Sequence, residues 1–194
     1  MNEGRTRPLR ADAARNRARL LDVAAEVFTE RGLGVTTEEI ARAAGVGVGT
    51  LFRHFPTKEA LLQAVLVRRM ERLVADGTEL AEREQPAEAF FAAFRLVVDR
   101  SAGKEEFARA LASAGIDVHA GLGELSGAVR ELLERLLTGA QRAGAVRPEL
   151  GVPELIALLV GTNASMEQLG PDPAAHERIF QVVFAGLRPA PADR

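Results

Sequence analysis

The stretch Thr36–Lys58, TTEEIARAAGVGVGTLFRHFPTK, decides the fold of this chain. Thr36 and Glu39 fit a capping box, in which each side chain satisfies a free backbone N–H at a helix start. Gly45 can end that helix, because glycine adopts the left-handed conformation without a steric penalty. Pro56 ends a second helix, since the residue before a proline resists α geometry. The pattern therefore predicts a helix-turn-helix motif, with a polar and basic second helix.

Composition places this motif in an all-helical protein. The 194 residues are 47% hydrophobic and 27% charged, as in soluble globular proteins, and helix formers dominate over β-branched and aromatic residues. No apolar run approaches the roughly 18 residues of a membrane span, and the first residues lack the apolar core of a secretion signal. The absence of cysteine excludes disulfides and thiolate chemistry and favours the cytoplasm. We therefore expect a cytoplasmic protein with no membrane association.

Charge is distributed unevenly along the chain. The net charge is −2, but the first 19 residues carry six arginines and two carboxylates, a local charge of +4, so the other 175 residues sum to −6. A basic segment on an acidic body suits a protein with one anion-binding surface. A solvated, disordered tail would have the same composition, so charge alone leaves both interpretations open.

Apolar periodicity predicts about nine helices in two domains. Residues 1–10 carry Gly4 and Pro8 and no periodicity, and are expected to form a flexible basic arm. Residues 11–57 form the helix-turn-helix domain, with the motif at about 36–55. Residues 58–187 form a second domain, and 188–194 a disordered tail. Helices are expected at about 11–31, 37–44, 48–55, 58–84, 87–101, 104–114, 122–143, 153–165 and 174–187.

A helix-turn-helix places its second helix in the major groove of double-stranded DNA and anchors the first on the backbone. Thr50 and Arg53 are best placed to leave the inner face, Arg53 toward guanine and Thr50 toward a thymine methyl. His54 and Lys58 would meet phosphates, and the glycines permit close approach. The candidate DNA-binding residues are Thr36, Thr37, Gly47, Val48, Thr50, Phe52, Arg53, His54 and Lys58.

Other chemistry finds little support in the sequence. The run GVGVGT resembles a phosphate-binding glycine loop, but such a loop needs a preceding strand, and here a helix precedes it. His54 taken alone is more often a surface or core histidine than a phosphate contact. No cluster has metal-ligand spacing, and no Ser–His pair forms a recognisable catalytic motif. We expect no catalytic residue, no cofactor and no metal.

The same stretch resembles the DNA-binding domain of TetR-family transcriptional regulators, over about residues 12–65. Gly144 to Pro148 and the rest of the chain are similar to the C-terminal domain of the SbtR-like subgroup. The family tyrosine that donates its hydroxyl to a phosphate is Phe52 here, so that hydrogen bond is lost. The matching positions are Gly32, Thr36-Thr37, Ile40-Ala41, Ala44-Gly45-Val46, Gly49-Thr50-Leu51-Phe52, His54-Phe55 and Lys58-Glu59-Ala60-Leu61-Leu62.

The resemblance implies a homodimeric repressor on a pseudo-palindromic operator, with half-sites about 34–36 Å apart. An unknown small-molecule effector in the C-terminal domain would release the DNA by moving the long fourth helix. Effector-binding candidates are Met70, Phe90, Phe91, Phe94, Phe107, Leu111 and Asn163, although core packing would use the same apolar residues. The last two helices would form a four-helix bundle in the dimer, with Leu155, Leu159, Ile179, Phe180, Val183 and Phe184 as interface candidates.

Two further hypotheses remain at the level of the sequence. One is a helical small-molecule binding protein whose DNA contact is weak or vestigial, suggested by Phe52 and the few polar side chains of the second helix. The other is a helical enzyme. The arginines of the first ten residues could also add minor-groove contacts, because narrow A·T tracts attract arginine.

Overall fold

Every regular element in the part of the chain that the structure describes is an α-helix, which confirms the predicted all-α fold. The computed structural model describes residues 6–101, 110–112 and 123–190. The chain divides into two compact units. Unit 1 comprises Met1–Arg69 and Gly103–Leu122, and unit 2 comprises Met70–Ala102 and Gly123–Arg194.

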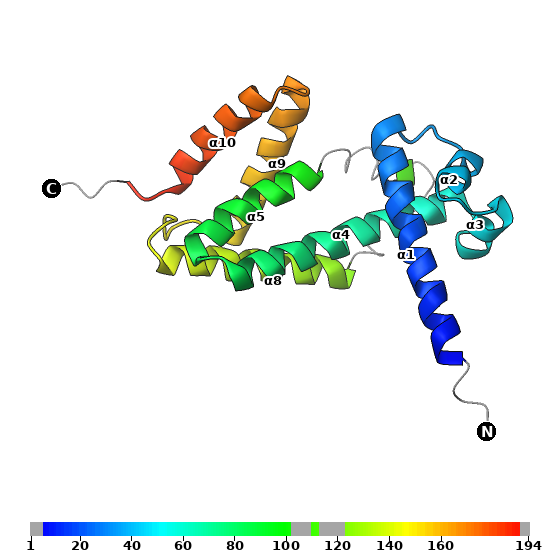
Figure 1. Ribbon diagram of the computed structural model, residues 1–194. Helices are drawn as coiled ribbons and strands as arrows, with labels where there is room; N and C mark the ends of the chain where they lie inside the picture. Colours follow the sequence, from blue (N-terminus) through cyan, green and yellow to red (C-terminus); the bar gives the residue numbers. More distant parts are fainter. Residues whose placement is uncertain (1–5, 102–109, 113–122, 191–194) are drawn as a thin grey trace. The chain divides into compact units, whose positions relative to one another are not determined.

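Unit 1 is built from α1 (Thr6–Arg31), α2 (Thr37–Ala43), α3 (Val48–His54) and the first half of α4 (Lys58–Arg83). Helix α2 packs against both α1 and α3 (Figure 1). The helices enclose one apolar core, in which buried side chains recur at helical spacing because each helix turns one face inward. Its members include Leu20, Ala24, Phe28, Ile40, Ala41, Leu51, Phe55, Leu61, Val65 and Leu111.

Helix α1 begins at Thr6, earlier than the expected start near Ala11. The expectation that residues 1–10 precede the first helix is therefore wrong for residues 6–10. Pro8 lies in the first turn, where the backbone N–H has no partner within the helix, so a proline is tolerated there. Residues 1–5 lie outside the described residues.

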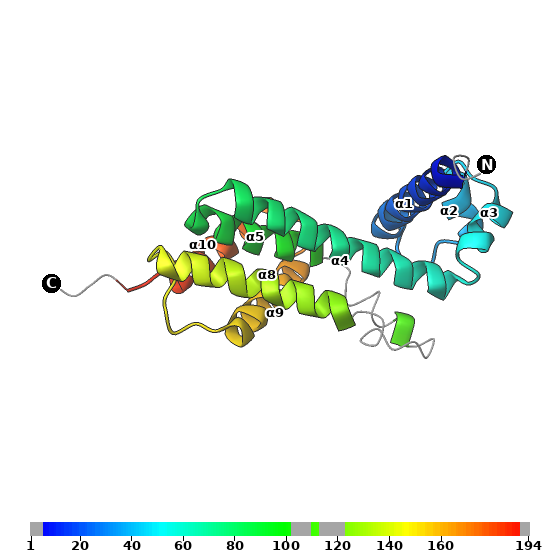
Figure 2. The same cartoon turned by 90° about the horizontal axis from the view of Figure 1, so that it is seen from below.

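Unit 2 contains the rest of α4 with α5 (Pro86–Ser101), α8 (Gly123–Arg142), α9 (Val152–Leu169) and α10 (Pro173–Leu187). Helix α5 packs against α8 and α9, and α9 packs against α10 (Figures 1 and 2). Residues 110–112 are helical, whereas the remainder of the helix expected at 104–114 lies outside the described residues. The core of unit 2 is rich in leucine and phenylalanine and includes Phe90, Phe94, Leu133, Leu137, Leu155, Leu159, Phe180, Phe184 and Leu187.

The boundary between the units falls inside α4 and not at the expected position before Lys58. Leu61, Leu62, Val65 and Leu66 are almost fully buried in the core of unit 1, so the first half of this helix belongs with the helix-turn-helix. A single continuous helix thus contributes residues to the cores of both units.

Two close contacts fix helix packing within unit 2. The guanidinium of Arg95 on α5 donates to both carboxylate oxygens of Glu177 on α10, at 2.7 and 3.0 Å. It also lies over the Phe180 ring, 4.3 Å from the centroid. On α4, a Cβ added to Gly77 would lie 2.6 Å from Leu132 Cδ2 of α8, so these helices approach where α4 has no side chain.

None of the helices in the described ranges combines the length and apolar composition needed to cross a membrane.

Candidate nucleic-acid interface

The first helix of the motif starts with the predicted capping box. The Thr36 hydroxyl accepts from the Glu39 backbone N–H at 3.3 Å, and Glu39 Oε2 accepts from the Thr36 N–H at 2.9 Å. Because the Thr36 N–H, and then its hydroxyl, donate to this carboxylate, the pKa of Glu39 lies below its ordinary value. These bonds fix the N-terminal end of α2 through contacts between Thr36 and Glu39 alone.

The turn between α2 and α3 depends on Gly45. This residue has φ +67°, a left-handed conformation that side chains with a Cβ rarely adopt. The Val46 N–H donates back to the Ala41 carbonyl at 3.0 Å, which closes the turn. From α1, Arg19 Nη2 donates to the Ala44 carbonyl at 3.1 Å, so an arginine of the first helix also holds the turn.

Helix α3 is held by its inner face and leaves its outer face free. Leu51 is fully buried, and Phe55, the C-terminal cap, is 2% exposed. On the outer face Phe52 is 40% exposed, and Arg53 and His54 are also exposed. An aromatic ring and two basic side chains therefore share the solvent-facing side of a short helix, where they are accessible to a DNA groove or backbone.

The remaining predicted contact residues differ in how accessible they are. Thr36 and Gly47 are exposed, and Val48 and Thr50 are half-buried. Thr37 is only 9% exposed, and its hydroxyl donates to Glu38 at 3.3 Å. Its side chain is therefore engaged within α2 and is poorly accessible to DNA. All nine predicted residues belong to unit 1.

Lys58 has a structural role that the sequence did not reveal. Its Nζ donates to the Leu33 carbonyl at 2.5 Å, which joins the first turn of α4 to the loop between α1 and α2. Arg17 also has an internal contact, with its guanidinium 5.0 Å from the Phe55 ring centroid. Both partners are more than twenty residues away in the sequence, so no local spacing could have signalled them.

The predicted effector-binding residues do not form one group. Phe90, Phe94 and Asn163 are buried in unit 2, where the Asn163 amide donates to Glu167 at 3.2 Å. Leu111 is fully buried in the core of unit 1. Met70 is half-buried, Phe91 lines an open pocket of unit 2, and Phe107 lies outside the described residues.

The residues predicted at a dimer interface pack inside one chain. Leu155, Leu159, Phe180 and Phe184 are 1–7% exposed, and Ile179 and Val183 pack against the same core. The apolar residues that α9 and α10 leave exposed are different ones. Leu158 is 37% exposed, Val160 58%, Leu169 47% and Val182 71%.

These features define an all-α protein with an N-terminal helix-turn-helix. Residues 20–65 match the family model of bacterial regulatory proteins of the tetR family. Residues 85–189, more than half of the chain, match the SbtR-like C-terminal domain of transcriptional regulators. The chain belongs to the TetR family of transcriptional regulators.

Solved structures and curated proteins agree with this assignment. A TetR transcription regulatory protein from Mycobacterium vanbaalenii is 43% identical, with a TM-score of 0.78, and the match covers 94% of this chain and 100% of that one. A TetR transcriptional regulator from Streptomyces coelicolor is 34% identical, with a TM-score of 0.76, over 89% and 98% of the two chains. The transcriptional regulator SrpR of Pseudomonas putida is 31% identical over 78% of this chain and 73% of its own length.

Proposed function

We propose that this regulator is a ligand-responsive homodimeric repressor that binds a pseudo-palindromic DNA operator and leaves it when a small molecule binds unit 2. The observation that carries the proposal is the outer face of α3. The fold uses Leu51 and Phe55 to hold this helix and leaves Phe52, Arg53 and His54 exposed.

In this proposal the exposed side chains divide between bases and phosphates. Arg53 Nε donates to the Gly49 carbonyl at 3.3 Å, and its terminal nitrogens remain for a guanine or a phosphate. His54 contacts phosphate. Lys58 has three N–H donors, so after its bond to Leu33 it keeps donors for the DNA backbone.

The dimer is proposed to form through the outer faces of α9 and α10. Val160 and Val182 are the most exposed large apolar residues described, and they lie on α9 and α10, respectively. Exposed apolar side chains on neighbouring helices favour an interface, and two identical faces satisfy one another in a twofold dimer. The six residues predicted from sequence would then support this surface from behind, as the protomer core.

Regulation by an effector rests on the TetR family membership. A regulator whose DNA-binding motif and ligand-binding unit share α4 can convert a change in one unit into a change in the other. The direction of the response, release of DNA on ligand binding, is the part of the proposal that follows from the family resemblance alone.

The test is fluorescence anisotropy with DNA from upstream of the chain's own gene, at low and high salt. We expect a saturable complex, with an affinity that falls as salt rises because phosphate contacts release counterions. The double variant Arg53→Ala, His54→Ala should lose binding, whereas Arg142→Ala, an exposed arginine of α8, should not. We expect the operator in the region upstream of the protein's own gene, so an intact dimer that binds no palindrome there would contradict this expectation.

The oligomeric state is tested by a separate measurement. Light scattering after gel filtration should give twice the chain mass, and Val182→Asp should give the monomer because it places a charge in the interface. A monomeric wild-type protein would contradict the interface.

A second candidate function is a small-molecule binding protein with a vestigial DNA contact. It is favoured by Phe52, which has no hydroxyl for a phosphate, and by the engagement of Lys58 with Leu33. Unchanged DNA affinity in the Arg53→Ala, His54→Ala double variant would support this candidate over the repressor.

A further inference from the structure

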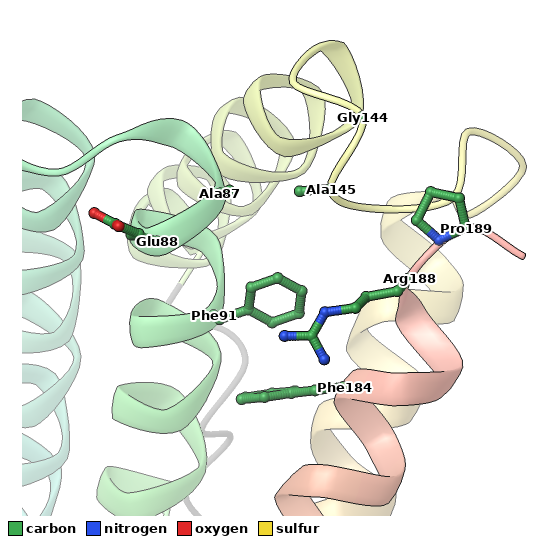
Figure 3. Close-up of a pocket in the computed structure, with 8 residues that line it drawn as sticks. All are labelled: Ala87, Glu88, Phe91, Gly144, Ala145, Phe184, Arg188 and Pro189. Carbon is green, nitrogen blue, oxygen red and sulfur yellow. The ribbon is translucent and has the colours of Figure 1, made fainter. Parts of the chain in front are cut away.

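One pocket of unit 2 lies between the start of α5, the loop after α8 and the end of α10 (Figure 3). We propose that this pocket binds a small aromatic carboxylate and that Arg188 holds the carboxylate group. Its volume is about 580 Å³, within the range of about 300–1,000 Å³ that small-molecule sites occupy. The pocket is lined by Ala87, Glu88, Phe91, Gly144, Ala145, Phe184, Arg188 and Pro189.

Arg188 supplies the positive charge of the pocket. Its guanidinium lies over the Phe91 ring, 4.9 Å from the centroid. Stacking occupies the face of a guanidinium and leaves its N–H groups, which lie in the plane, free for a planar acceptor. Within the described residues, nothing accepts a hydrogen bond from this guanidinium or forms an ion pair with it. Figure 3 shows the Glu88 carboxylate directed away from it.

The apolar residues that line the pocket favour a ligand with an aromatic ring. The Phe91 and Phe184 rings lie 4.8 Å apart, centroid to centroid, at an angle of 53°. Ala87, Ala145 and Pro189 complete the lining with short apolar groups. Phe184 is only 7% exposed and supports Phe91 from the core. A flat apolar ring would therefore contact the accessible part of Phe91 while its carboxylate meets the arginine.

The pocket is formed before any ligand arrives. Gln141 Nε2, at the end of α8, donates to the Arg147 carbonyl at 3.1 Å and to the Leu150 carbonyl at 2.8 Å, which fixes the loop. The Arg147 backbone N–H donates to the Leu187 carbonyl at 3.0 Å, and Arg147 Nη2 donates to the Arg188 carbonyl at 3.3 Å. These bonds anchor the backbone of Arg188 to the loop, so binding does not have to order this part of the backbone.

The charge of the pocket sets the class of ligand. The Arg188 guanidinium matches a monoanion, and the Glu88 carboxylate, which also lines the pocket, is directed away from it. The uncharged amide of the same acid keeps the ring but loses the charge-assisted hydrogen bonds. Because every residue that lines the pocket belongs to unit 2, the site is expected whether or not the chain binds DNA.

The test is isothermal titration of the full-length protein with naphthoate and with its uncharged amide, naphthamide. We expect naphthoate to bind about tenfold or more tightly than naphthamide, because hydrogen bonds to a charged partner are stronger than neutral ones. Arg188→Gln should remove this difference. Arg142→Gln, which replaces an exposed arginine of α8 outside the pocket, should retain it.

A second variant tests the pocket without changing charge. Ala145→Leu fills the space beside Arg188 and should abolish binding of both compounds, while the thermal midpoint shows that the protein still folds. Equal affinity of acid and amide in the wild-type protein, or unchanged binding in both pocket variants, would overturn the proposal. DNA binding measured on the same samples separates this result from the repressor proposal: either can fail while the other stands.

Discussion

Leu51 is the side chain that attaches α3 to unit 1, and its replacement by alanine is expected to release this helix. Leu51 is fully buried, and the other residues of α3 are partly or fully exposed. The helix has seven residues, and isolated helices shorter than about 12–15 residues are marginal in water. Helix α3 therefore persists because it packs, and Leu51 is the centre of that packing.

The size of the effect follows from the burial of the side chain. Leucine-to-alanine changes in protein cores cost about 2–5 kcal/mol, a loss of transfer energy with an added cavity. We take a loss of packing free energy of about 2.7 kcal/mol, near the lower end of this range. Because each 1.4 kcal/mol changes an equilibrium constant about tenfold, the equilibrium between closed and opened α3 should shift about 100-fold toward the opened state. DNA affinity should fall in proportion to the fraction of molecules in which α3 remains closed.

Hydrogen exchange measured by mass spectrometry checks this expectation directly. In Leu51→Ala the amides of α3 should exchange faster than in the wild-type protein. Leu155→Ala is the matched control, because Leu155 is 1% exposed but lies in α9 of unit 2. It should lower stability without loosening α3. Unchanged protection of the α3 amides in Leu51→Ala, together with unchanged DNA affinity, would show that Leu51 does not hold α3 in place.

Three further predictions concern stability. Thr36→Ala should lower the free energy of unfolding by about 1 kcal/mol through loss of the cap, measured by urea denaturation, and Thr36→Ser should restore it. Gly77→Ala adds a methyl 2.6 Å from Leu132 Cδ2. The steric overlap should cost about 1–3 kcal/mol of stability, more than the gain of about 1 kcal/mol from the higher helix propensity of alanine. The net loss of stability should disappear in a Leu132→Ala background. The hydrogen bonds from Arg95 lower the pKa of Glu177 from its ordinary 4.5. The stability that this pair contributes is present above pH 4.5 and is lost as pH falls through the lowered pKa, so Glu177→Gln should flatten acid denaturation below pH 4.5. An equally steep acid transition in Glu177→Gln would exclude that contribution.

The helix-turn-helix could be predicted from sequence because its signals are local. Thr36 and Glu39 cap each other across three residues, and the left-handed Gly45 lies within the turn that it makes possible. Leu51 and Phe55 follow the helical spacing of an inner face, and both are buried. Each of these features depends on neighbours within a few positions, which the sequence displays directly.

The long-range contacts could not be predicted in this way. The positive charge of Lys58 suggested a phosphate contact, but its Nζ donates to the carbonyl of Leu33, 25 residues away in the sequence. Helix α9 carries apolar residues on more than one face, so the pattern could not tell the buried Leu155 and Leu159 from the exposed Leu158 and Val160. The contact between the Arg188 guanidinium and the Phe91 ring joins two residues that are far apart in the sequence, so no local pattern indicates it.

The bond between Lys58 and Leu33 has a mechanical consequence. It joins the first turn of α4 to the segment that leads directly into the capped start of α2. A shift of this turn must carry the α1–α2 loop with it unless the bond breaks, so the motif is expected to respond as a rigid body and not by bending. The placement of α3 therefore also depends on this ammonium group, which lies outside both helices of the motif.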